Sequence, residues 1–248
     1  MKLTFSQKLD AACDSLRPNR YALKPYLVPD GKTHPLAVIC PGGGYRMVCS
    51  FVEGKPFARA LNALGIHAVV VYYRVGSKAL YPAPQDDLER AIRETLSHTE
   101  DWHLDPAGYS LWGSSAGAHL AASFCTEHRD VPAPGALILT YPVISMGELA
   151  HPGSRDNLLG RNPDPALIEK MSVELQVTPD YPPTYLWCGS ADRTVNPENS
   201  RRMAEALKAH HVPHRFETFE GIDHGVGLGR AEGLPWFEHA VDFWLQQR

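Results

Sequence analysis

Tyr109-Ser-Leu-Trp112, Gly113-Ser-Ser-Ala-Gly117 and Ala118-His-Leu-Ala-Ala-Ser-Phe-Cys125 follow one another without a break. The first segment is an apolar run that predicts a strand, and the alanine-rich stretch Ala116–Cys125, which overlaps the end of the second segment, predicts a helix. Between them, the pattern Gly-x-Ser-x-Gly predicts a sharp turn that holds Ser115 in a strained conformation at the start of the helix. The dipole of that helix favours negative charge beside Ser115. We expect the neighbouring Ser114 side chain to point elsewhere.

Further apolar runs alternate along the chain with segments of helical spacing. Continuous apolar runs suit strands that are buried on both faces of a parallel sheet. The predicted strands are 36–40, 66–72, 109–112, 136–140, 184–188 and 214–219. Helical stripes are formed by Phe57, Leu61 and Leu64; by Leu88, Ala91, Ile92 and Leu96; by Met203, Leu207 and His210; and by Phe237, Val241, Trp244 and Leu245. This alternation predicts an α/β fold with a mainly parallel sheet and helices on both of its faces.

The length of 248 residues suits one α/β domain, 1–248, with a single interruption. From Ser145 to Pro183 the sequence is rich in proline and has no strong strand pattern. Long irregular segments in compact domains are often lids or binding loops. We therefore expect a lid-like insertion at about 145–183.

Composition and charge argue against several classes of protein. Hydrophobic residues make up 44% and charged residues 21%, which is ordinary for a globular protein. Lys and Arg number 24 against 28 Asp and Glu, and without a basic stripe we expect no nucleic-acid partner. The N-terminal segment lacks an apolar signal region, and no apolar stretch approaches about 18 residues, so we expect a cytoplasmic protein without a membrane partner. Reduced thiols and no metal site are predicted from five cysteines without metal-binding spacing: Cys13, Cys40, Cys49, Cys125 and Cys188.

A serine hydroxyl needs a base and an orienting acid to act as a nucleophile. Sites built on a strand–serine–helix turn supply them in the order serine, acid, histidine. Asp192 lies in a Gly-Ser-Ala-Asp loop after an apolar run, at the carboxyl edge of the predicted sheet, and His224 lies in a glycine-flanked loop after the last predicted strand. We interpret Ser115, Asp192 and His224 as a catalytic triad. Asp180 and Asp223 are weaker alternatives for the acid, because neither directly follows a strand.

Attack by a serine creates an oxyanion, which backbone N–H groups stabilise. One N–H is expected from Ala116, the residue after the nucleophile. The second is expected from Cys40-Pro-Gly-Gly-Gly-Tyr45, because three glycines let the backbone approach a substrate closely. A phosphate-binding loop is the alternative, but it would need a following Lys-Ser/Thr or a Gly-x-Gly-x-x-Gly pattern, and neither occurs in this segment.

Together these segments resemble the α/β-hydrolase superfamily and, within it, the bacterial esterase/lipase group that includes acetyl-xylan and other sugar-ester esterases. The resemblance implies Ser115 as nucleophile, Asp192 as acid, His224 as base, and Gly43, Gly44 and Ala116 as oxyanion donors. Related families carry a histidine before the three glycines, where this chain has Cys40-Pro41, and a second glycine after the turn, where it has Ala118. The likeness runs through Pro41–Tyr45, Val71–Val75, Tyr81–Asp87, Gly113–Gly117, His119–Ala122, Pro182-Pro183 and His224-Gly225.

The resemblance implies a serine carboxylesterase that hydrolyses short acyl esters through an acyl-enzyme, with acetylated saccharides among its substrates and no cofactor. Tyr45 is expected either to stack on a sugar ring or to pack. A small serine peptidase or amidase and a non-catalytic hydrolase-fold binding protein are the alternatives, and a homo-oligomer is left open. A polar alcohol and a small acyl group are favoured over a long acyl chain by the polar residues of the insertion: Arg155, Asp156, Asn157, Arg161 and Asn162.

Overall fold

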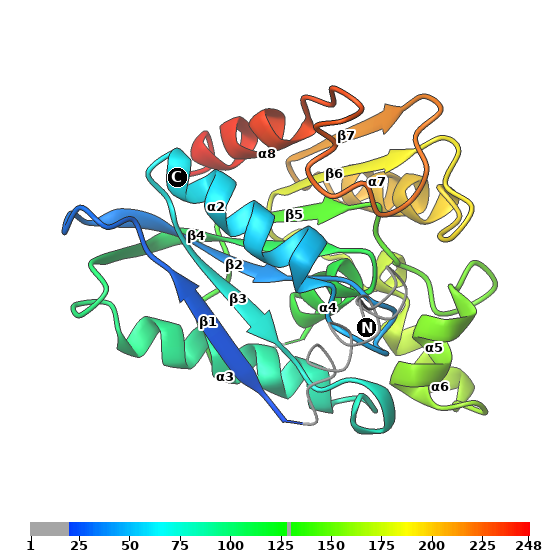
Figure 1. Ribbon diagram of the computed structural model, residues 1–248. Coiled ribbons are helices and arrows are strands. Elements are labelled where there is room, and N and C mark those ends of the chain that lie inside the picture. The colour runs from blue at the N-terminus through cyan, green and yellow to red at the C-terminus, as the bar shows by residue number, and fades with distance from the viewer. Residues whose placement is uncertain (1–19, 128–129) are drawn as a thin grey trace, which may run out of the picture.

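A seven-stranded sheet forms the centre of the computed structural model, which describes residues 20–127 and 130–248 (Figure 1). The strand order is β1-β3-β2-β4-β5-β6-β7, and every neighbouring pair is parallel except β1 with β3. The mainly parallel α/β architecture predicted from the sequence is confirmed. The strands are β1 (Ala22–Tyr26), β2 (His34–Cys40), β3 (His67–Tyr72), β4 (Leu104–Ser114), β5 (Ala136–Thr140), β6 (Thr184–Gly189) and β7 (His214–Phe219).

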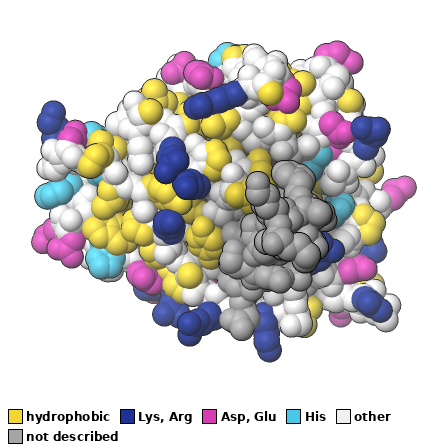
Figure 2. All heavy atoms as spheres, viewed as in Figure 1, with side chains coloured by type: hydrophobic (Ala, Val, Ile, Leu, Met, Phe, Trp, Pro, Cys, Tyr) yellow, Lys and Arg dark blue, Asp and Glu magenta, His cyan; other side chains and the backbone are white. Residues whose placement is uncertain are grey.

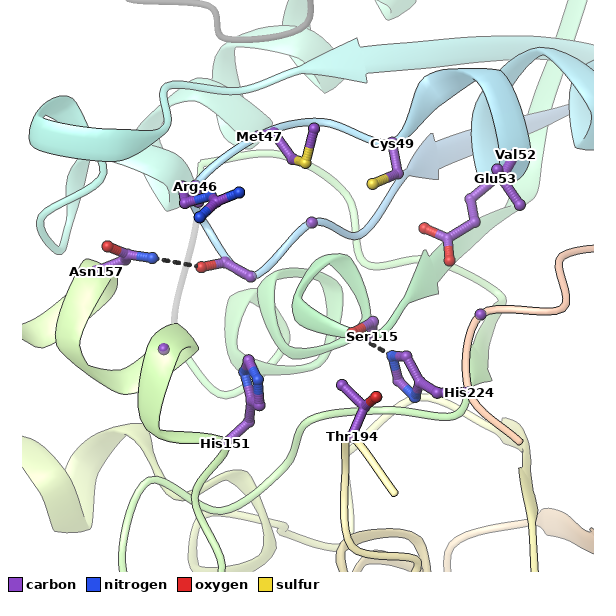
Figure 3. Close-up of a pocket in the computed structure, with 14 residues that line it drawn as sticks. Arg46, Met47, Cys49, Val52, Glu53, Ser115, His151, Asn157, Thr194 and His224 are labelled. Carbon is purple, nitrogen blue, oxygen red and sulfur yellow. Dashed lines mark hydrogen bonds between the residues drawn. The ribbon is translucent and has the colours of Figure 1, made fainter. Parts of the chain in front are cut away.

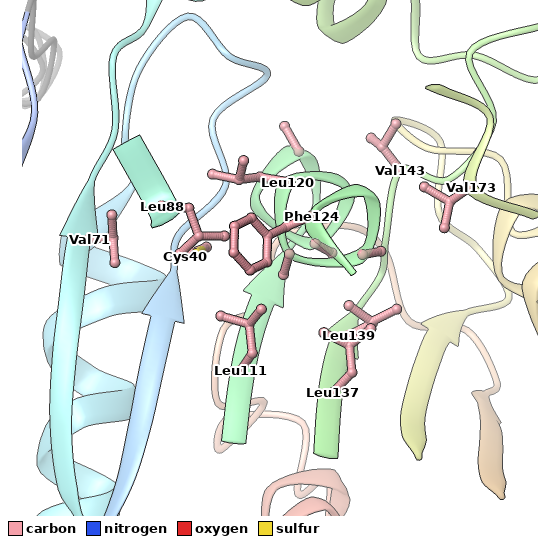
Figure 4. Packing of buried hydrophobic residues seen from close by; sticks show 14 of the residues in the cluster. Cys40, Val71, Leu88, Leu111, Leu120, Phe124, Leu137, Leu139, Val143 and Val173 are labelled. Atoms are coloured by element: carbon pink, nitrogen blue, oxygen red, sulfur yellow. The ribbon is translucent and has the colours of Figure 1, made fainter. Parts of the chain in front are cut away.

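Helices cover both faces of the sheet, and the strands alternate their side chains between them. In β2, Leu36, Val38 and Cys40 belong to one core and Ala37 and Ile39 to the other. The first core packs against α3, α4 and α7, and Figure 4 shows leucines of β4 and β5 beneath α4. The second core packs against α2 and α8. The helices are α2 (Lys55–Ala63), α3 (Ala83–Ser97), α4 (Ala116–Phe124), α5 (Pro152–Leu159), α6 (Pro165–Met171), α7 (Glu198–Ala209) and α8 (Trp236–Leu245), with the short turns η1 (Ser50–Gly54), η2 (Gly76–Lys78) and η3 (Val173–Leu175).

Strand β1 carries no apolar run that would have predicted it. It is an edge strand that pairs only with β3, and it contains Pro25, which edge strands tolerate. Three residues of the predicted helical stripes are exposed rather than buried. Leu64 lies just beyond the end of α2, His210 lies just beyond the end of α7, and Leu245 is the last residue of α8. The helical period therefore predicts burial within each helix but not at its end.

The segment between β5 and β6 contains α5, α6 and η3, where the sequence predicted an insertion without strands. Both helices begin with a proline at their first position, after a capping side chain from His151 or Asp164. Figure 1 shows them beyond the carboxyl ends of the parallel strands. Ligands gather at this edge in open α/β sheets, so the insertion lies beside the expected site.

Charges of both signs are mixed on the surface. Figure 2 shows Lys and Arg interspersed with Asp and Glu over the visible described residues. Within 20–127 and 130–248, no helix has the length and apolar character needed to cross a membrane. Cys40 and Cys188 are buried and Cys49 and Cys125 are half-buried, while Cys13 lies outside the described residues.

Candidate active site

Ser115 lies in the turn between β4 and α4, with φ of 52° and ψ of −119°. This left-handed conformation costs a non-glycine residue about 1–2 kcal/mol, so the surrounding packing must maintain it. A Cβ atom on Gly113 would lie 2.5 Å from the Cα of Ala118, and one on Gly117 would lie 2.1 Å from the carbonyl oxygen of Cys40. Both glycines of the motif are therefore required by the close approach of α4 to the strands.

Three polar side chains from the loops after β4, β6 and β7 meet at this turn. The Nε2 atom of His224 lies 2.9 Å from Ser115 Oγ (Figure 3), and its Nδ1 atom lies 2.7 Å from Asp192 Oδ2. Because a carboxylate only accepts hydrogen bonds, Nδ1 carries the proton and Nε2 accepts from the serine hydroxyl. Asp192 Oδ1 accepts from the N–H groups of Thr194 and Val195 at 2.9 Å each. This arrangement suits transfer of the serine proton to the imidazole.

The two alternative acids lie elsewhere. Asp223 pairs with Arg193 at 2.9 Å and accepts from the backbone N–H of His224, not from its ring. The hydrogen bond from the Arg193 guanidinium lowers the pKa of Asp223 to about 2. Asp180 lines a separate cavity. Of the three carboxylates, Asp192 is the one bonded to the imidazole ring of His224.

Two carbonyl groups of the glycine loop after β2 are bonded within the loop itself. The Gly42 carbonyl accepts from the Cys49 N–H at 2.8 Å. The Gly43 carbonyl accepts from the N–H groups of Arg46 and Met47 at 3.0 and 3.2 Å. In a trans peptide the carbonyl and the following N–H point in opposite directions. The N–H groups of the second and third glycines therefore point away from these internal contacts.

The three expected oxyanion donors surround Ser115. Gly43 and Gly44 line the same cavity as Ser115 and have φ of 130° and 64°. Among the described residues, nothing accepts a hydrogen bond from either N–H. Ala116 begins α4, so its N–H has no acceptor within the helix. These N–H groups are available to a ligand bound at Ser115.

A buried carboxylate and two tyrosines anchor this loop where related families have a histidine. The Tyr73 hydroxyl donates to the Pro41 carbonyl at 2.6 Å. Glu53 accepts from the Gly42 N–H at 2.7 Å and from the Tyr141 hydroxyl at 2.8 Å. Burial raises the pKa of Glu53, although both hydrogen bonds oppose that rise. The Cys40-Pro41 departure is thus accompanied by a different set of anchors.

Tyr141 also connects Glu53 to the histidine loop. Its ring packs edge-on against the ring of His224, with centroids 4.7 Å apart. Its hydroxyl oxygen accepts from the Gly227 N–H at 3.3 Å. No sequence pattern pointed to Glu53 or Tyr141, because they lie 88 positions apart and meet only in the fold.

Of the two roles expected for Tyr45, substrate contact and packing, the structure shows packing. The prediction that Tyr45 contacts a substrate is therefore wrong. The Tyr45 side chain is fully buried, and its hydroxyl lies 2.8 Å from Nδ1 of His119. His119 Nε2 donates to the Met171 carbonyl at 2.8 Å, so Nδ1 accepts from the tyrosine. Tyr45 therefore supports the glycine loop from behind, since the glycines themselves occupy the substrate side.

A cavity of about 420 Å³ opens in front of Ser115. Figure 3 shows Met47 and Cys49 on one side of Ser115 and His151 and Thr194 on the other. Within the described part of the chain, no three His, Cys, Asp or Glu side chains are arranged to hold a metal ion. Further lining residues are Gly43, Gly44, Arg46, Val52, Glu53, Gly153, Asn157, His224 and Gly225.

The insertion contributes two side chains to the site, Asn157 and His151, and the sequence did not predict an individual role there for either one. Asn157 of α5 donates from Nδ2 to the Gly44 carbonyl at 2.8 Å (Figure 3). His151 caps the start of α5 and lines the cavity. The proline that follows His151 is typical of a helix start. Nothing in the sequence indicates that this helix lies beside the glycine loop.

Comparison with known proteins identifies the fold family of the chain. The profile of the alpha/beta hydrolase fold family matches residues 38–228. Acetylxylan esterase from Xylanibacter ruminicola is 31% identical over 86% of this chain, and endo-1,4-beta-xylanase B from Butyrivibrio fibrisolvens is 31% identical over 87%. The chain spans only 44% and 35% of the lengths of these two curated relatives.

Solved structures extend the comparison to the fold. The acetyl ester-xyloside bifunctional hydrolase from Caldicellulosiruptor lactoaceticus superimposes with a TM-score of 0.81 at 37% identity, covering 90% of this chain and 87% of the other. A sugar hydrolase from Lactococcus lactis gives a TM-score of 0.81 at 26% identity, covering 93% and 95%. The predicted resemblance to bacterial esterases is confirmed, and the chain belongs to the alpha/beta hydrolase fold family.

Proposed function

We propose that this protein is a serine ester hydrolase acting on short acyl esters, with Ser115 as nucleophile, His224 as base and Asp192 as orienting acid. The observation that carries this proposal is the pair of contacts, 2.9 and 2.7 Å long, that links the three side chains at the edge of a cavity. The names of the acetylxylan esterase and of the acetyl ester-xyloside hydrolase support the same chemistry.

The reaction would proceed in two halves. Ser115 Oγ attacks the ester carbonyl carbon and passes its proton to His224 Nε2, while the carbonyl oxygen becomes an oxyanion. The N–H groups of Gly43, Gly44 and Ala116 are the candidate donors to that oxyanion. The bond to the alcohol then breaks, and His224 gives its proton to the departing oxygen, which leaves an acyl-serine.

Water resolves this intermediate by the same route. His224 takes a proton from the water as its oxygen attacks the acyl carbon, and the bond to Ser115 Oγ breaks. The proton returns to Oγ, and the carboxylic acid leaves. Asp192 keeps its contact with Nδ1 of His224 and stabilises the imidazolium in both halves.

Replacement of the nucleophile tests this assignment. Ser115→Ala is expected to lower kcat for 4-nitrophenyl acetate by about 10⁴–10⁶-fold while the protein stays folded, because a triad member acts as part of a unit. Ser114→Ala is the matched control, since the Ser114 hydroxyl is bonded to Thr140 at 2.8 Å and lies off the relay. A folded Ser115→Ala protein with wild-type turnover would refute the proposal. Faster cleavage of an acyl anilide than of its matched ester would favour the amidase alternative.

A small acyl group is the second part of the proposal. Among the residues that line the cavity, Met47, Cys49 and Val52 have apolar side chains, and the remaining side chains are polar. Each buried methylene contributes about 0.8 kcal/mol, so a long-chain lipase would need a much longer apolar trough. We expect kcat/KM to be highest for acetyl or propionyl esters in a series of 4-nitrophenyl esters. A maximum at octanoyl or longer would contradict the small acyl group and leave the ester hydrolase standing.

A further inference from the structure

His151 stands between two hollows at the active site. Its side chain lines the cavity of Ser115 and also an adjoining depression of about 480 Å³. Thr194 is the other residue that lines both. In Figure 3, His151 and Thr194 lie on the opposite side of the Ser115–His224 pair from Met47. A ligand that extended from one hollow into the other would pass these two residues.

The adjoining depression has the polar character that a hydroxylated alcohol needs. Glu148, Arg193 and Asn196 line it and are exposed to solvent. Asp192 lines it as well, so it lies beside the histidine that must return a proton to the departing alcohol. The alcohol of an ester bound at Ser115 is therefore expected to extend toward this depression, with its acyl group toward the apolar side.

The hydrogen bonds of His151 fix which ring nitrogen carries the proton. Its Nδ1 atom accepts from the Ser154 backbone N–H at 3.2 Å and lies 2.9 Å from Ser154 Oγ. A backbone donor at Nδ1 requires a lone pair there, so the neutral ring carries its proton at Nε2. Burial lowers the pKa of His151 below its ordinary value of about 6.5, so the ring is neutral near pH 7.

The Cε1 corner of this ring lies close to the glycine loop. Its Cε1 atom, which lies between the two nitrogens, is 3.8 Å from the position that a Cβ of Gly44 would occupy. Within the described residues, no acceptor is bonded to Nε2 of His151. The site thus holds one N–H donor without an acceptor, on a side chain that lies close to the glycine loop and lines both hollows.

We infer that His151 is a specificity-determining residue that donates from Nε2 to a hydroxyl adjacent to the esterified oxygen, so that the enzyme favours monoesters of polyols, saccharides included, over esters of simple alcohols. This inference rests on the proposed function. A simple alkyl ester offers no acceptor at that position, and the donor would then be covered without a hydrogen bond. Sites built to bond a substrate hydroxyl discriminate against analogues that lack it for this reason.

The test must separate substrate contact from helix capping, because His151 is also the N-cap of α5. Asparagine is a strong N-cap residue, so His151→Asn keeps the cap while removing the long imidazole donor. His151→Phe keeps a ring of similar size and removes the donor but loses the cap. His210→Asn, at an exposed histidine after α7, is the matched control.

The measurement is the ratio of kcat/KM for 2-hydroxyethyl acetate to kcat/KM for propyl acetate. These esters have alcohols of nearly equal size and differ by one hydroxyl. We expect the wild-type protein and His210→Asn to prefer the hydroxylated ester by about tenfold, which is the usual effect of one hydrogen bond. In both His151 variants the ratio is expected to fall close to one. A common effect on both esters cancels in this ratio.

A wild-type ratio near one would overturn the inference, and so would a preference that survives in both His151 variants, whatever happens to the absolute rates. The proposed function fails in a different way: the wild-type protein would hydrolyse neither ester, or Ser115→Ala would hydrolyse both as fast as the wild type.

Discussion

At the scale of single residues, Glu53 anchors the glycine loop, although nothing in the surrounding sequence indicates that role. It is a buried carboxylate that accepts from the Gly42 N–H and the Tyr141 hydroxyl. Tyr141 in turn packs against His224. One side chain therefore couples the loop that offers the oxyanion donors to the side chain expected to act as base. Both partners are donors, so the two carboxylate oxygens satisfy them fully.

We predict that Glu53 acts as a positioning residue, and Glu53→Ala should lower kcat by about 10–100-fold while KM changes little. Small displacements of catalytic groups cost rates of this order, whereas the other residues that line the cavity stay in place. Glu53→Gln keeps one acceptor for Gly42 and should recover part of the loss. The exposed Glu205→Ala on α7 serves as the control. A folded Glu53→Ala protein with wild-type kcat, or one in which only KM rises, would show that Glu53 has no positioning role.

At the scale of elements, continuous apolar runs predicted β5 and β7 at the bounds that the structure has, and β2, β3 and β6 within two residues. Strands β2, β3, β5 and β6 lie inside the sheet and are almost entirely buried, so their composition reflects their environment. Strand β1 is an edge strand whose residues are all exposed or half-buried and include a proline, so no apolar run marked it. The physical difference is the depth of burial, which a single sequence displays only through the apolar runs of the inner strands.

The same contrast applies to the site. The three proposed triad residues and the glycine loop each follow a strand, and chain order with loop composition was enough to select them. His151, Asn157 and Glu53 lack such a marker, because their partners are fixed by tertiary packing. Asn157 meets Gly44 across 113 positions. The insertion that carries Asn157 was predicted as lid-like, and its movement stays a prediction.

At the scale of the whole molecule, His119 joins parts that are distant in sequence. It lies on α4, accepts from Tyr45 of the glycine loop, and donates to the carbonyl of Met171 at the end of α6. The imidazole is completely buried, and burial lowers its pKa to about 4. A charged ring could no longer accept from Tyr45 at Nδ1 and would have no solvent around it. Its protonation therefore opposes the folded state.

This linkage gives the molecule a defined response to acid. The unfolded chain binds a proton at His119 below about pH 6.5, and the folded protein does not until about pH 4, so the free energy of unfolding should fall as pH drops between these values. From pH 7 to pH 5 the contribution of this one group is about 2 kcal/mol. Urea unfolding at both pH values measures it in the wild type, in His119→Gln, which cannot titrate, and in the exposed control His210→Gln. The pKa values of His67 and His151 are also lowered, but both residues are present in every variant, so their effects cancel in the comparison. We expect His119→Gln to lose about 2 kcal/mol less than His210→Gln over this interval, and equal losses would show that His119 titrates alike in the folded and unfolded chains.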